Sequence, residues 1–175
     1  MLYLKCTAEV QKILGLPKSA LAQAISTDAS LGNWYINRFK IDQRDVYIFM
    51  SESTYLSFLL YQGKKPVTAT TLPNMMLAGI EQLLLMRGYS KTIVGEALTP
   101  YHSGLYAKTD NRSVLGVLND LVLCYRTMIE AEGGLHSCDL TSIIMKMNKM
   151  PQRTLQWSNS WEAVQAKLGR PETIH

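Results

Sequence analysis

The sequence predicts one α+β domain in which an antiparallel sheet of about five strands carries helices mainly on one face. Turn-forming residues at 42–45 separate two runs rich in aromatic and β-branched residues, a pattern typical of a β-hairpin. Further along the chain the apolar spacing changes to three and four residues, which favours helices. The 175 residues are 47% hydrophobic and 18% charged, enough for one buried core but few for two. We find no internal repeat and no linker, so residues 1–175 are predicted to form a single globular domain.

The first part of the chain is predicted to contain one strand and two helical stretches. Residues 2–6 form a short apolar strand, and Thr7 is suited to cap a helix that Gly15 ends. The alanine-rich stretch at 16–25 favours a second helix, and the polar run 26–33 indicates a loop.

The next part is predicted to be an antiparallel meander with strands at 34–41, 46–50 and 54–61. Eight aromatic residues lie on these strands, more than one buried face can use, so a second surface is implied. That surface is covered by the chain's own helices, used by a partner subunit, or open as a shallow ligand groove. Because an open edge strand invites pairing, we predict a homodimer with at least one of four residues at the contact: Trp34, Tyr35, Tyr47 or Tyr55.

The second half mixes helices with short extended pieces. A periodic apolar stripe predicts a helix from Pro73 to Gly88. Residues 91–98 and 105–108 are expected to be extended. Further helices are predicted over about residues 111–132, 140–147 and 161–168.

A polar cluster directly before the helix at 111–132 is the main candidate site. Asp110 or Thr109 can cap the free amides of the first turn, which places Arg112 and Ser113 at a helix N-terminus. Such an end attracts anions, and it is also an ordinary way to start a helix. We expect Arg112 to make a charge-assisted contact to a carboxylate or to backbone carbonyls. The predicted ligand-binding residues are Lys108, Thr109, Asn111, Arg112 and Ser113, joined by Asp120 and His102.

Asn119 and Asp120 fall in the middle of the same helix, with apolar residues on both sides. One of them is expected to lie near the buried stripe and therefore to need a hydrogen-bonding partner. In a structural role, this residue bonds the backbone of a neighbouring strand or pairs with Arg112 or Lys108. In a functional role, it forms a polar pocket with Arg112 and Lys108.

The polar cluster contains the most specific motif of the chain, Lys-Thr-x-Asn-Arg-Ser-Val-Leu-Gly at residues 108–116. Shorter motifs are Lys-Cys-Thr at 5–7, Gly-Asn-Trp-Tyr at 32–35, Asn-Asp at 119–120, Gly-Gly-Leu at 133–135 and Met-Asn-Lys-Met-Pro at 147–151. Together they resemble an uncharacterised bacterial domain family, a domain of unknown function also met on plasmid and mobile-element proteins. The resemblance spans nearly the whole chain and implies no established activity, cofactor or catalytic residue.

Signatures of common catalytic and cofactor chemistry are missing from the sequence. The chain has no Walker-type loop and no Gly-x-Gly-x-x-Gly turn for phosphates. His136 and Cys138 form one local pair, without a second pair to complete four metal ligands. Ser113 lacks an identifiable neighbouring base, although His102 could approach it in space, and Cys124 lies in an apolar helical stretch. We therefore predict no metal and no cofactor.

Most of the formal net charge of +4 lies in residues 140–175, which hold five cationic and two acidic residues. Trp157 and Trp161 are interleaved with Lys146, Lys149 and Arg153, an arrangement that could track phosphates and stack bases. The alternative is a solvated helix face with both tryptophans in the core. We expect weak nucleic-acid binding at most.

No apolar run approaches the roughly 20 residues that a transmembrane helix needs. The N-terminus does not resemble a signal peptide, and three widely spaced cysteines suit a reducing compartment, so a cytosolic location is predicted. The predicted function is a non-catalytic binding or regulatory module of the bacterial cytosol with a protein or nucleic-acid partner. The alternative is a small enzyme or small-ligand binder using Lys108, Asn111, Arg112 and Ser113. Convergence of Lys108, Arg112, Asp120 and His102 in one pocket would favour this alternative.

Overall fold

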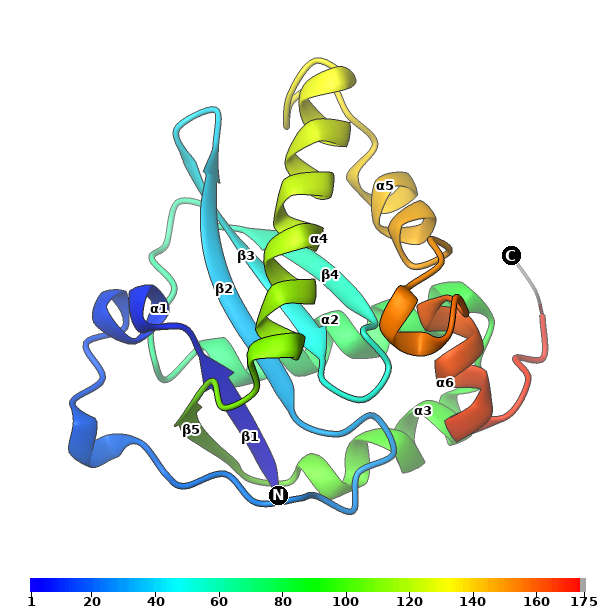
Figure 1. Ribbon diagram of the computed structural model, residues 1–175, viewed down its shortest axis with the longest axis horizontal. Coiled ribbons are helices and arrows are strands. Elements are labelled where there is room, and N and C mark those ends of the chain that lie inside the picture. Colours follow the sequence, from blue (N-terminus) through cyan, green and yellow to red (C-terminus); the bar gives the residue numbers. More distant parts are fainter. Residues whose placement is uncertain (174–175) are drawn as a thin grey trace.

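The computed structural model describes residues 1–173, which fold around one five-stranded sheet with the order β4-β3-β2-β1-β5 (Figure 1). The central strand β1 (Leu2–Cys6) runs parallel to both of its neighbours, β2 (Trp34–Ile41) and β5 (Gly104–Lys108). β3 (Arg44–Ser51) and β4 (Ser57–Tyr61) continue the sheet in antiparallel pairing. The sheet is therefore mixed, and the prediction of an antiparallel sheet is wrong. The long connections before β2 and before β5 let the chain cross over and re-enter the sheet in the direction of β1.

Six α-helices lie around the sheet. Their bounds are α1 (Ala8–Ile13), α2 (Leu72–Arg87), α3 (Lys91–Leu98), α4 (Arg112–Ala131), α5 (Leu140–Met147) and α6 (Ser160–Leu168). Three single 3₁₀ turns, η1 (Lys18–Ala20), η2 (Thr99–Tyr101) and η3 (Arg153–Leu155), complete the regular structure of the described residues. No helix within residues 1–173 is long and apolar enough to span a membrane.

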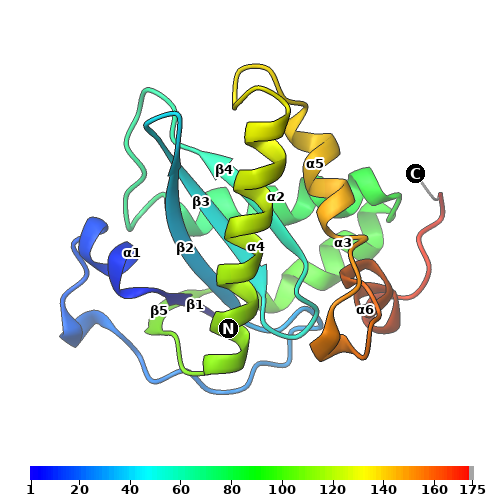
Figure 2. The ribbon, with the colours of Figure 1, turned by 45° about the horizontal axis from the view of Figure 1, so that its top comes forward.

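Helices cover both faces of the sheet, whereas the sequence predicted them mainly on one face. Two neighbouring residues of β4 show this arrangement. The Ser57 hydroxyl lies 2.9 Å from the Tyr125 hydroxyl of α4, whereas the Phe58 ring packs so closely on Gly79 of α2 that a Cβ there would overlap it. Because successive strand residues point to opposite faces, α4 and α2 lie on opposite sides of the sheet (Figures 1 and 2).

Because helices cover both faces of the sheet, aromatic residues on either face of the meander can be buried. Trp34, Tyr35, Tyr47 and Tyr55 are all buried within one copy of the chain. Of the three alternatives for the second surface, cover by the chain's own helices is the one observed. Each of the four side chains is at most 8% exposed, which leaves little contact area for a second copy, and the homodimer stays a prediction.

The predicted hairpin is present and tighter than expected. Asp42 and Gln43 adopt left-handed φ values of 52° and 62°, and Ile41 pairs directly with Arg44. Two consecutive left-handed residues make the two-residue turn whose twist matches that of the flanking strands.

Two local predictions fail because the backbone finds other partners. Residues 91–98 are helical, since the Ser90 hydroxyl caps α3 by accepting a hydrogen bond from the Ile93 amide at 3.2 Å. The stretch at 16–25 is helical only over η1. Beyond it, the Ala22 amide donates to the Tyr106 carbonyl at 2.7 Å, which draws this segment along the outer edge of β5.

Candidate functional site

The residue that caps the start of α4 lies one or two positions later than the sequence predicts. The Asn111 carbonyl oxygen Oδ1 accepts hydrogen bonds from the Ser113 and Val114 amides at 2.9 and 3.1 Å. Asn111, rather than Asp110 or Thr109, is thus the N-cap. Because these two amides are already bonded within the chain, they are not free to hold an external anion.

The loop before α4 is bound to the sheet by the hydroxyl of Tyr35 on β2. This hydroxyl donates to Asp110 Oδ1 at 2.8 Å and accepts the backbone amides of Asn111 at 3.0 Å and Asp110 at 3.3 Å. One buried tyrosine therefore fixes both the side chain and the backbone of the segment that leads into α4.

Lys5 completes this network from β1. Its ammonium Nζ lies 2.6 Å from Glu52 and 3.0 Å from Asp110, and its side chain is only 7% exposed. Burial alone would lower the pKa of Lys5, but the hydrogen bonds to Glu52 and Asp110 outweigh it and raise that pKa. Burial likewise acts to raise the pKa of Asp110, and the hydrogen bonds from Tyr35 and Lys5 reverse this effect and lower it.

The ligand-binding residues predicted from the sequence do not meet in one place. Lys108, Arg112, Ser113 and Asp120 are all exposed, as is His102 at the opposite end of β5. The extended strand between them, Gly104–Lys108, alone spans about 13 Å, and His102 lies beyond its far end. Eight helical residues separate Arg112 from Asp120 by about 12 Å. The convergence that would have favoured a small enzyme is therefore absent from this set.

Two further predictions about this helix are wrong. The Arg112 side chain makes no hydrogen bond or ion pair with any of residues 1–173, so it does not tether the loop; Asp110 and Asn111 do so. Asn119 and Asp120 are both exposed, because the buried stripe of α4 follows residues 114, 118, 121, 125 and 129 and leaves both positions on the outer face.

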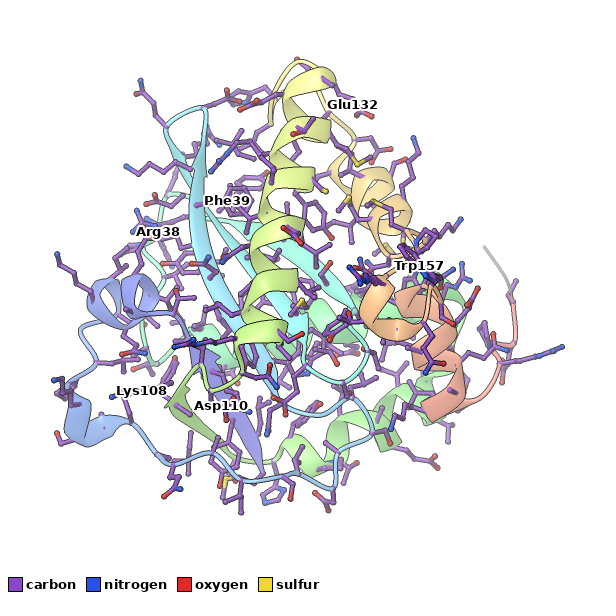
Figure 3. The ribbon with its side chains drawn as sticks, viewed as in Figure 1. Arg38, Phe39, Lys108, Asp110, Glu132 and Trp157 are labelled. Atoms are coloured by element: carbon purple, nitrogen blue, oxygen red, sulfur yellow. The ribbon has the colours of Figure 1, made fainter. Side chains whose placement is uncertain are left out.

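One open cavity of about 410 Å³ lies beside the end of β5. It is lined by Lys18, residues 21–24, Lys108 and Asp110, and Figure 3 labels the last two where the strand leads towards α4. Of the predicted residues only Lys108 reaches this cavity; Thr109 is half-buried and does not line it. The cavity thus brings two lysines and one carboxylate together beside the buried Lys5 network.

The cysteines and potential metal ligands are dispersed. Burial raises the pKa of Cys6 to about 12, which keeps its thiol protonated and unreactive at neutral pH. Cys124 and Cys138 are half-buried, and burial raises the pKa of each. Within residues 1–173 no three His, Cys, Asp or Glu side chains are grouped so that they could hold a metal ion.

The second predicted region forms what we call the basic turn, residues 146–157, which runs from the last turn of α5 towards α6. Lys146, Lys149 and Arg153 are all exposed on it. The two tryptophans differ in burial: Trp157 is 68% exposed and Trp161 is 3% exposed. The Arg87 guanidinium lies 5.0 Å from the ring centre of Trp161. The interleaved surface predicted from the sequence therefore contains one tryptophan, not two. Figure 3 shows Trp157 on the other side of the molecule from Lys108 and Asp110.

Sequence reasoning missed the three partners that organise the polar loop, Lys5, Tyr35 and Glu52. A usable signal was present for Lys5 alone, since it is the one charged residue in an otherwise apolar predicted strand. A charge in such a position needs a buried partner. Which carboxylates supply it depends on contacts across 47 and 105 residues.

The described residues thus form a mixed α/β fold on a single sheet, and residues 108–116 connect the end of β5 to the start of α4. Residues 3–163 match the family described as "Domain of unknown function (DUF6933)", and the chain belongs to that family. The family resemblance expected from the motifs is confirmed, while bacterial origin and association with mobile elements stay predictions. No curated protein and no solved structure matches the chain.

Proposed function

We propose that this protein is a non-catalytic binding module and that its basic turn binds nucleic acid through the phosphates. The observation that carries the proposal is the charge of residues 140–161, which include three cationic residues and no acidic one. All three, Lys146, Lys149 and Arg153, are exposed. A one-signed cluster of this kind attracts a polyanion by releasing the counterions bound to its phosphates.

The three cations are free to meet a ligand. None of them forms an ion pair with another of residues 1–173, whereas Lys5 and Arg38 both do. The backbone between the two lysines is anchored to the sheet by Asn148. Its side chain accepts the Ser57 amide at 2.9 Å and donates to the Ser57 carbonyl at 2.8 Å. Because the backbone that carries these charges is already ordered, binding does not have to order it.

The proposal is tested by fluorescence polarisation with a labelled oligonucleotide. The triple variant Lys146→Ala, Lys149→Ala, Arg153→Ala should lose binding. The control variant Lys12→Ala, Lys65→Ala, Lys91→Ala removes the same charge from three exposed sites elsewhere and should retain most of it. Equal weakening in both variants would point to net charge alone and would contradict a site at the basic turn.

A second candidate function is supported by the cavity beside β5. Its two lysines, Lys18 and Lys108, suit a small anionic ligand of the size that about 410 Å³ admits. A thermal-shift titration with inorganic phosphate and with citrate tests this candidate. Stabilisation by either anion that disappears in Lys108→Ala would support it, and equal shifts in the wild type and in Lys108→Ala would oppose it.

A further inference from the structure

The basic turn holds an aromatic ring that the phosphate contacts do not require. Trp157 is 68% exposed, while the other two tryptophans of the chain, Trp34 and Trp161, are 0% and 3% exposed. Its side chain makes no hydrogen bond, ring contact or cation–π contact with any of residues 1–173. A large apolar side chain left in water without a packing partner presents a free face to a ligand.

The turn that presents this ring is closed by its own backbone. The Gln152 carbonyl accepts the amides of both Leu155, at 3.0 Å, and Trp157, at 2.9 Å, and the Gln152 amide donates to Ser158 at 2.9 Å. Gln156 and Trp157 adopt left-handed φ values of 55° and 67°, which residues other than glycine seldom do. These bonds hold Trp157 in a defined direction, outside the packed core.

Positively charged residues lie on the same turn as the ring. Arg153 belongs to the same closed turn, since its carbonyl accepts the Gln156 amide at 3.0 Å. Lys149 precedes Arg153 by four residues and is also exposed. A cationic surface next to an exposed aromatic ring is the combination by which proteins bind single-stranded nucleic acid, with phosphates on the cations and a base on the ring.

We infer that Trp157 stacks on an unpaired base, so that the basic turn selects single-stranded over double-stranded nucleic acid. This inference rests on the proposed function. The bases of a duplex are already stacked on one another, and inserting a ring between them costs unstacking energy. An unpaired base offers its face without that cost, and every base has such a face, so the preference extends to single strands of any sequence.

The arrangement of the tryptophans makes the test direct. Trp157 alone among the three is open to a ligand, so intrinsic tryptophan fluorescence reports on its contact with a base. We expect a short single-stranded oligonucleotide to quench the fluorescence, and a duplex of the same length to quench it much less. Trp157→Ala should weaken single-strand binding about tenfold, within the range of a single base–aromatic stack, and leave duplex binding unchanged.

Two variants serve as controls. Trp157→Phe keeps a ring and should retain most of the single-strand preference. Leu123→Ala removes an apolar side chain of similar exposure, 61%, from the outer face of α4 and should change neither affinity. Circular dichroism spectra and unfolding midpoints of all three variants should match those of the wild type, because these side chains are exposed.

The outcomes separate this inference from the proposed function. Equal affinity for single strand and duplex, unchanged in Trp157→Ala, overturns the stacking inference and leaves phosphate binding intact. The stacking inference is also overturned, with phosphate binding intact, if the triple alanine variant loses affinity for single strand and duplex while Trp157→Ala has no effect. No binding of either oligonucleotide overturns the proposed function itself. Equal quenching by polyglutamate overturns both in favour of an acidic peptide.

Discussion

Lys5 on β1 and Asp110 on the loop before α4 form an ion pair of 3.0 Å although 105 residues separate them in the chain. The same lysine bonds Glu52 at 2.6 Å, so one buried ammonium connects the centre of the sheet to the end of β3 and to the start of the longest helix. The polar motif at 108–116 is thus partly a structural element, because its one acidic residue, Asp110, holds the start of α4 to the sheet.

Replacing Lys5 by methionine should destabilise the fold. The variant leaves the Glu52 and Asp110 carboxylates without their shared partner, and the half-exposed position of Asp110 limits the penalty to about 2 kcal/mol of unfolding free energy. Urea denaturation measures this difference. Lys108→Met, at an exposed lysine without a partner among residues 1–173, should stay within about 0.5 kcal/mol of the wild type.

The same ion pair predicts a pH dependence of stability. The folded pKa of Asp110 lies below its ordinary value of 3.8, so its contribution is complete above pH 3.8 and is lost as the pH falls through the folded pKa. The folded pKa of Lys5 lies above 10.5, so its contribution is complete below pH 10.5 and is lost as the pH rises through the folded pKa. The stability difference between the wild type and Lys5→Met should therefore be largest near neutral pH and shrink at both extremes. A difference that is constant from acid to alkaline pH would contradict this role.

Neighbouring residues at the start of α4 should differ in their effect on stability. Asn111→Ala removes the cap of two amides and should cost about 1 kcal/mol. Arg112→Ala removes an exposed side chain and should leave the unfolding midpoint unchanged, contrary to the 1–3 kcal/mol range that a charged contact would imply. Thermal or urea unfolding of both variants in one buffer measures the two changes in stability. Equal destabilisation by both variants would contradict this difference.

Two helical glycines should respond in opposite directions to alanine. A Cβ at Gly79 would overlap the Phe58 ring, so Gly79→Ala should destabilise the fold by about 1–3 kcal/mol. Nothing lies within 4 Å of a Cβ at Gly116, so Gly116→Ala should stabilise α4 by up to about 1 kcal/mol. Differential scanning calorimetry of both variants measures the two shifts. A destabilised Gly116→Ala would show that the outer face of α4 is more constrained than its open surroundings indicate.

Local patterns in the sequence predict much of the fold. Strand β1, the hairpin at 42–43, helices α2 and α4 to α6, and the end of α4 near Gly133 all follow from apolar spacing, turn residues and caps. The parallel direction of β1 and the cover on both faces do not, because they depend on how the chain crosses over between distant segments. Helix α3 was missed since the β-branched residues of 91–98 favour a strand, and the Ser90 cap with tertiary packing overrides that preference.

The candidate site was only partly predictable. Exposure of Lys146, Lys149 and Arg153 agrees with the pattern of charges, whereas the different fates of Trp157 and Trp161 depend on packing of α6 against Arg87 and the core. At the polar loop, the sequence identified residues 108–113 as a polar cluster. It did not identify the residues that bond this cluster, because Lys5 and Tyr35 lie on strands far earlier in the chain.

The central claim, that the basic turn binds nucleic acid, is tested most directly by the salt dependence of oligonucleotide affinity. Three phosphate contacts on a single strand predict a slope of about −2 for the logarithm of the association constant against the logarithm of salt concentration. The triple variant Lys146→Ala, Lys149→Ala, Arg153→Ala should bring this slope close to zero and remove measurable binding, and the Lys12, Lys65, Lys91 variant should keep the wild-type slope. A wild-type slope near zero, or the same slope in both triple variants, would contradict the account.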